Sequence, residues 1–189
     1  MKSRYYIYIP IFIVTLVMFF FVIRSSNKVN DNLTFSTKWD YTQTFSFDFE
    51  ELESISFIQT AREKYSGTYA ALVDSNTVFG PTFNVLGYEK LDKLVKVDVS
   101  AMLYYPYPLH ECNMIFSLDT FGDALVFMGD DLGKENTPGE WHNVTFSFLF
   151  DRNKVSLKRL STLDLRIYPL NYGQLFYVDD MIVTFYLRD

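Results

Sequence analysis

Cysteine and histidine are scarce in this chain of 189 residues. The sequence has one Cys, so no intrachain disulfide can form, and with two His it offers no Cys/His cluster for zinc. Two His also leave little material for the usual catalytic arrangements, and we expect no enzyme. Lys and Arg (17) are outnumbered by Asp and Glu (23), giving a net charge of -6. This charge argues against nucleic acid as a partner.

Aromatic residues, in contrast, are abundant. They make up 19% of the chain, with 19 Phe and 14 Tyr, and 49% of all residues are hydrophobic. This composition is too apolar for a disordered chain and favours β-structure.

The chain begins with an uncharged, apolar run, Tyr5–Ile23. At ~1.5 Å rise per residue, such a helix would nearly span the ~30 Å hydrocarbon core of a bilayer. Two interpretations stay open for residues 1–24: an uncleaved transmembrane signal-anchor or a cleaved signal peptide. The run ends in bulky side chains, which favours the anchor. Lys2 and Arg4 precede it, so we expect a single-pass membrane protein whose remainder faces the periplasm or the exterior.

Residues 25–38 are polar and predict a linker, and residues 39–189 predict one folded domain. Period-two alternation of apolar and polar residues dominates this domain, and no long amphipathic helix is needed. The clear strands are expected at 45–49, 69–73, 95–103, 144–150, 163–167 and 175–187, and weaker ones at 55–59, 82–86, 112–118 and 124–128. Turn signals separate them at regular spacing. The pattern predicts an all-β, antiparallel jelly-roll β-sandwich.

Four short motifs fall in a familiar order along the domain. They are Phe49-Glu50, Ser66-Gly67-Thr68-Tyr69-Ala70, Gly139-Glu140-Trp141 and Tyr177-Val178-Asp179-Asp180-Met181. This order resembles that of jelly-roll carbohydrate-binding modules and the wider galactose-binding-like superfamily.

The resemblance implies a structural Ca²⁺ held by Glu50 and Asp179. Calcium is a hard cation that takes several oxygen ligands, carboxylates among them. Asp179 alternates in step with Met181, so we expect its side chain to point inward. An alternative stays open, in which Asp179 and its neighbour pair with Arg or Lys side chains or cap a turn.

Two loops could bind a sugar. Tyr104, Tyr105 and Tyr107 lie in one Tyr- and Pro-rich stretch, and Asn171 and Tyr172 lie in another. Sugar rings stack on aromatic faces while polar side chains bind the hydroxyl groups. The alternative is that both loops simply cover the end of the sandwich and pack on its core.

Two functions follow as expectations. The first is a membrane-anchored, non-catalytic binding module for a glycan of the cell envelope. The second is a structural or assembly subunit of an envelope complex that binds a protein partner through the sandwich. Catalysis as a glycosidase is not expected, because adjacent carboxylates in a strand point to opposite faces rather than across a cleft.

Overall fold

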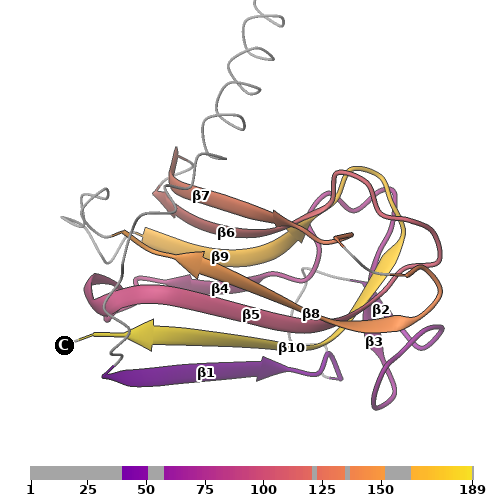
Figure 1. Ribbon diagram of the computed structural model, residues 1–189, viewed down its shortest axis with the longest axis horizontal. Coiled ribbons are helices and arrows are strands. Elements are labelled where there is room, and N and C mark those ends of the chain that lie inside the picture. Colours follow the sequence, from indigo (N-terminus) through magenta and orange to yellow (C-terminus); the bar gives the residue numbers. More distant parts are fainter. Residues whose placement is uncertain (1–39, 51–57, 121–122, 135–136, 152–162, 189) are drawn as a thin grey trace, which may run out of the picture. The chain divides into compact units, whose positions relative to one another are not determined.

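Alternating apolar and polar residues build two antiparallel sheets that pack face to face (Figure 1). The computed structural model describes residues 40–50, 58–120, 123–134, 137–151 and 163–188. All of them belong to one compact unit, Lys38–Asp189.

Sheet A has the strand order β2-β3-β10-β5-β8, and β1 pairs with the second half of β10. Its strands are β1 (Tyr41–Phe47), β2 (Ile58–Thr60), β3 (Ala70–Val73), β5 (Leu94–Tyr104), β8 (Trp141–Leu149) and β10 (Phe176–Leu187). Sheet B has the order β4-β9-β6-β7. Its strands are β4 (Phe83–Leu86), β6 (Asn113–Thr120), β7 (Asp123–Asp131) and β9 (Leu163–Leu170).

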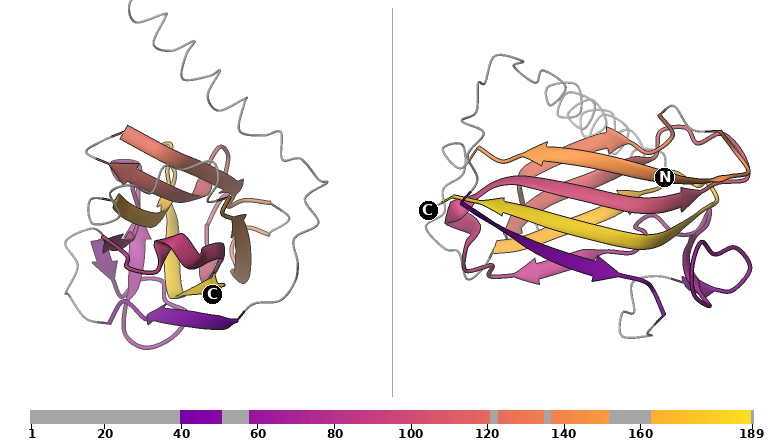
Figure 2. Two further views of the ribbon diagram at one scale, coloured as in Figure 1. Left: turned by 90° about the vertical axis from the view of Figure 1, so that its left-hand side faces the viewer. Right: turned by 60° about the horizontal axis from the view of Figure 1, so that its bottom comes forward.

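The core lies between the two sheets (Figure 2). Every second residue of the long strands points into it, and Phe116 of β6 stacks on Phe148 of β8 with ring centroids 5.9 Å apart. Phe185 of β10 meets Phe45 and Phe83 at 5.4 and 5.8 Å. Burial of these rings together with the aliphatic side chains of the core stabilises the sandwich.

The predicted all-β antiparallel sandwich is confirmed for the described residues, and each expected strand has a counterpart there; residues 55–57 of the strand expected at 55–59 lie outside the described residues. The first strand differs in its bounds. It begins at Tyr41 and ends at Phe47, because Phe49 has a φ of 58° and leaves the extended conformation. One turn of 3-10 helix, Leu91–Lys93, precedes β5.

The prediction of an anchor over residues 1–24 and a linker over 25–38 lies outside the described residues. Within the part of the chain that the structure describes, no helix has the length and apolarity needed to cross a membrane.

Candidate functional site

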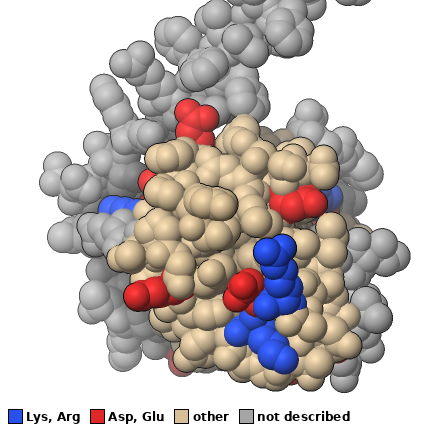
Figure 3. All heavy atoms as spheres, turned by 90° about the vertical axis from the view of Figure 1, so that its right-hand side faces the viewer, with Lys and Arg blue, Asp and Glu red and all other residues tan. Residues whose placement is uncertain are grey.

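The two loops predicted to bind sugar lie side by side at one end of the sandwich. The backbone N–H of His110 donates to Oε1 of Gln174 at 3.0 Å, and Nε2 of Gln174 donates to the carbonyl oxygen of His110 at 2.7 Å. Figure 3 shows this end face on: uncharged residues cover much of it, and a group of Lys and Arg side chains with an acidic side chain beside them lies near its middle. The structure therefore brings the two candidate loops together at one end of the sandwich.

Their predicted ligand residues differ in accessibility. Tyr107 and Tyr172 are 73% and 48% exposed. Tyr105 and Asn171 are each only 1% exposed, and Tyr104 packs against Trp141 at 5.6 Å. A buried ring presents no face to a sugar. Of the predicted set, Tyr107 and Tyr172 are thus the residues that a ligand could readily touch, whereas Tyr105 and Asn171 fit the alternative of loops packed on the core.

Asn171 holds the end of the sandwich together by polar contacts. Its Nδ2 donates to the carbonyl oxygens of Asp74 (2.7 Å), Thr77 (2.9 Å) and Gln174 (2.9 Å). Its Oδ1 accepts the backbone N–H of Gln174 at 2.9 Å and lies 3.4 Å from Sγ of Cys112. These bonds use the hydrogen-bonding capacity of the amide within the fold.

Glu50 and Asp179 both bind the loop between β2 and β3. Oε1 of Glu50 accepts the backbone N–H groups of Thr68 (2.7 Å) and Tyr69 (3.0 Å). Oδ2 of Asp179 accepts those of Tyr65 (2.9 Å) and Ser66 (3.1 Å). The two carboxylates therefore fix the loop through four of its peptide groups.

The prediction that the side chain of Asp179 points inward is wrong, because a β-bulge interrupts β10 at this position. Asp179 pairs with Met102 of β5, but the next pair along the two strands joins Ile182 to Ser100, so β10 holds one extra residue. Asp180, inside the bulge, has a φ of 44°. The bulge reverses the alternation, so Asp179 lies on the face opposite to Met181, away from the core. Asp179 is nevertheless buried, because the loop covers it.

The contacts of these carboxylates fit the turn-capping alternative. Oδ1 of Asp179 accepts the backbone N–H of Asp180 at 2.8 Å, so both of its oxygens face N–H donors. Among the described residues, no three His, Cys, Asp or Glu side chains gather as a metal site. Calcium binding by Glu50 and Asp179 stays a prediction. Its test must distinguish carboxylates that bind a cation from carboxylates that only accept hydrogen bonds from N–H groups.

Titration of Asp179 provides that test. Burial raises the pKa of Asp179 above its ordinary value of 3.8, against the lowering effect of its backbone hydrogen bonds. The stability that this group contributes is therefore complete below 3.8 and is lost as the pH rises through the raised pKa. We expect the melting temperature of the wild type, relative to that of Asp179→Asn, to fall as the pH rises from 3.5 toward neutrality, on the order of a few degrees.

A bound Ca²⁺ would reverse this trend, because it favours the ionised carboxylate. The melting curves are therefore recorded with added Ca²⁺ and with EDTA. A melting temperature that EDTA lowers in the wild type, but not in Asp179→Asn, would establish the calcium site and contradict the cation-free interpretation.

The outer face of sheet B carries a second group of polar and aromatic side chains. Strand register places one residue of each strand in a row: Asn84, Arg166, Ser117 and Phe127. Because alternate residues share a face, Tyr168 lies on the same side of β9 as Arg166. This face is formed by strands rather than loops, so its side chains have fixed spacing.

Charged and hydroxyl groups interact at the centre of this face. Nε of Arg166 donates to Oδ2 of Asp164 at 2.6 Å, and its Nη2 contacts the same oxygen. Oδ2 of Asp119 lies 3.9 Å from Nε of Arg166 and accepts the hydroxyl of Ser117 at 3.1 Å. Arg166 thus lies between two carboxylates, and its side chain keeps 45% exposure.

Burial raises the pKa of Asp119, and the hydroxyl of Ser117 and the guanidinium of Arg166 oppose this rise. The hydrogen bond to Asp164 raises the pKa of Arg166. Oδ1 of Asp164 is buried and has no hydrogen-bond donor among the described residues. A buried acceptor without a hydrogen bond is energetically unfavourable, and a donor that reached this oxygen would remove that cost.

Two aromatic rings flank this polar centre. Phe79 is 56% exposed and meets Tyr168 edge to face at 5.4 Å, and Phe127 is 39% exposed on the other side. Exposed ring faces beside carboxylate, guanidinium and hydroxyl groups match the two needs of sugar binding, which are stacking on C–H faces and hydrogen bonds to hydroxyls.

None of these residues belongs to the set of ligand residues predicted from the sequence. A signal was present, because Asp164 and Arg166 occupy the polar positions of a predicted strand. The pairing of that strand with β6, which brings Asp119 and Ser117 beside them, depends on a register that the sequence does not state.

Comparison with known proteins identifies the fold. No protein-family model matches the chain, and no curated protein sequence matches it. The structure is similar to the CBM22-1 xylan-binding domain of Xyn10C from Paenibacillus barcinonensis, with a TM-score of 0.50 and 14% identity over 77% of this chain and 95% of that domain. The CBM22-1–CBM22-2 tandem of the same protein gives a TM-score of 0.53 and 14% identity over 82% and 48%.

These neighbours are jelly-roll carbohydrate-binding modules, so the resemblance found in the sequence is confirmed at the level of the fold. At 14% identity the comparison establishes the fold alone.

Proposed function

We propose that this domain is a non-catalytic carbohydrate-binding module that holds a glycan chain across the outer face of sheet B. The single observation that carries the proposal is the arrangement of Arg166 between Asp119 and Asp164, with Phe79 and Phe127 exposed on either side. The fold it shares with a xylan-binding domain supports this function.

Charge limits the kind of glycan. Two carboxylates surround one guanidinium, so the centre of the face has no positive excess to attract uronic acids. Neutral sugars, whose hydroxyls both donate and accept hydrogen bonds, suit Asp119, Asp164 and Arg166.

Replacing Arg166 by alanine is expected to weaken glycan binding about ten- to a hundredfold, the value of a lost charge-assisted hydrogen bond. The measurement is a binding isotherm of the full-length protein against a panel of polysaccharides that includes xylan. Phe79→Ala removes an exposed ring without altering the charges and should weaken binding as well. Arg62→Ala, an exposed arginine on the loop after β2, is the matched control and should bind like the wild type. Equal binding by all variants would contradict this site.

Tyr107→Ala tests the loop surface in the same assay. A loss of glycan binding in this variant, but not in Arg166→Ala, would place the sugar at the end of the sandwich instead.

We further propose that residues 1–24 anchor the protein in a membrane, with the domain in the periplasm or outside the cell. The motivating observation is the uncharged run Tyr5–Ile23 preceded by Lys2 and Arg4. A protease added outside intact cells or spheroplasts should digest the domain. Protection of the domain would contradict this topology.

Exposed apolar and aromatic side chains at this end of the sandwich favour a second candidate function, that of an assembly subunit that binds an envelope protein. Val78, Tyr107 and Tyr172 expose 54%, 73% and 48% of their surface on loops joined by hydrogen bonds. If the folded protein binds no polysaccharide, cross-linking from position 107 to one defined envelope protein would support this alternative.

A further inference from the structure

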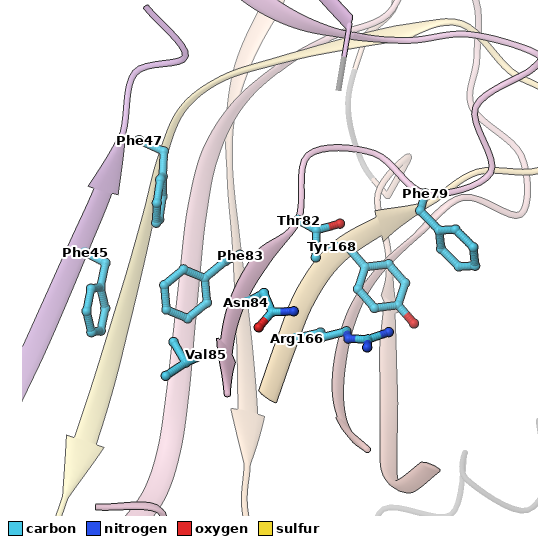
Figure 4. Close-up of a pocket in the computed structure, with 9 residues that line it drawn as sticks. All are labelled: Phe45, Phe47, Phe79, Thr82, Phe83, Asn84, Val85, Arg166 and Tyr168. Atoms are coloured by element: carbon cyan, nitrogen blue, oxygen red, sulfur yellow. The ribbon is translucent and has the colours of Figure 1, made fainter. Parts of the chain in front are cut away.

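A pocket of about 800 Å³ opens at one long edge of the sandwich (Figure 4). Its lining comes from two chemically different sets of residues. Phe45, Phe47, Phe83 and Val85 form an apolar set. The other set is polar except for Phe79 and comprises Thr82, Asn84, Arg166, Tyr168 and Phe79. Figure 4 shows β4 between the two sets.

The apolar set lies where two edge strands face each other. Among the described residues, β1 pairs only with β10 and β4 pairs only with β9. Phe83 meets Phe45 at 5.1 Å and Phe47 at 5.4 Å, yet Phe45 and Phe47 are only partly buried. We call this group, Phe45, Phe47, Phe83 and Val85, the phenylalanine mouth.

The mouth is poorly suited to a sugar. Its side chains offer no hydrogen-bond donor or acceptor, so a hydroxyl that entered would lose its bonds to water without replacement. An apolar group, in contrast, would bind with a favourable free energy, because it would cover ring surface that now contacts solvent.

We propose that the mouth binds the apolar aglycone of an amphiphilic glycoside whose sugar lies on the outer face of sheet B. This inference rests on the proposed function, because the pocket is continuous from Arg166 and Tyr168 to the mouth. An occupant that spans it has a polar part on one side of β4 and an alkyl or aryl part on the other.

The apolar dye N-phenyl-1-naphthylamine tests the mouth independently of the sugar. The full-length protein should bind it saturably, and octyl β-glucoside below its micellar concentration should displace it at least tenfold more effectively than methyl β-glucoside. The octyl chain is seven methylenes longer than the methyl group, and each buried methylene can increase the affinity by up to about fourfold. A tenfold ratio is therefore a low threshold.

Two variants locate the effect. Val85→Trp fills the mouth, and Phe47→Ser removes one wall, so each should lose dye binding and the advantage of the octyl chain. Ile182→Ser is the matched control, because Ile182 is 40% exposed on the opposite sheet. Circular dichroism melting identifies a variant that fails to fold, and the other variant then decides the outcome.

The results separate the two proposals. Polysaccharide binding without dye binding at the mouth, or dye binding that both variants retain, overturns the mouth and leaves the carbohydrate-binding module standing. Dye binding at the mouth with no affinity for octyl glucoside or for any polysaccharide overturns the proposed function and the amphiphile with it.

Discussion

Replacing Asn171 by alanine is expected to lower the free energy of unfolding by about 3 kcal/mol, the cost of leaving several buried polar groups without partners. The carbonyl oxygens of Asp74, Thr77 and Gln174 would lose their shared donor, and the backbone N–H of Gln174 would lose its acceptor. The measurement is urea unfolding of the variant and the wild type, read as a change in midpoint at constant slope.

Two further variants separate structure from ligand binding. Asn171→Asp keeps the acceptor for Gln174 but turns an oxygen toward three carbonyls, so it should destabilise at least as much as alanine. Tyr172→Ala, at the exposed neighbouring position, is the control and should change stability by no more than about 0.5 kcal/mol. Unchanged unfolding in Asn171→Ala would contradict the structural role and return Asn171 to the candidate ligand residues.

Local alternation was enough to predict most of the fold. Strands β8 and β9 and the middle of β5 each present one face to the core, so their burial follows a period of two that the sequence displays directly. The same rule failed at Asp179 because it assumes an uninterrupted strand. A bulge at a non-glycine residue, Asp180, leaves no mark in the hydrophobic pattern.

The candidate site was less predictable, because it depends on contacts between distant segments. The sequence shows that residues 104–107 are rich in tyrosine, but it does not show which ring turns inward. Tyr105 does so, and Tyr107 does not. The outer face of sheet B likewise needs β4, β9, β6 and β7 in register before its polar residues meet.

The loop held by Glu50 and Asp179 depends on a single glycine. Gly67 has a φ of 53°, a conformation that residues with a Cβ seldom adopt. A Cβ at this position would also collide with Oε1 of Glu50 and would lie 2.8 Å from its Cδ. The backbone of Gly67 therefore passes directly against the carboxylate that accepts the N–H groups of Thr68 and Tyr69.

Gly67→Ala is consequently expected to lower the free energy of unfolding by more than the ~1 kcal/mol that a left-handed alanine costs by itself. Gly173→Ala is the matched control, because Gly173 has a φ of 86° and no atom within 4 Å of an added Cβ. The Gly173→Ala variant should therefore show only the free-energy cost of placing an alanine in the left-handed conformation.

A double-mutant cycle with Glu50→Ala isolates the collision from the backbone cost. Once the carboxylate is absent, Gly67→Ala should cost no more than Gly173→Ala, and the coupling between positions 50 and 67 should exceed about 0.5 kcal/mol. Additive effects would mean that Glu50 does not hold the loop through this contact. Strong coupling would show that the Glu50 and Ser66-Gly67-Thr68-Tyr69-Ala70 motifs, which suggested the fold in the sequence, form one structural unit.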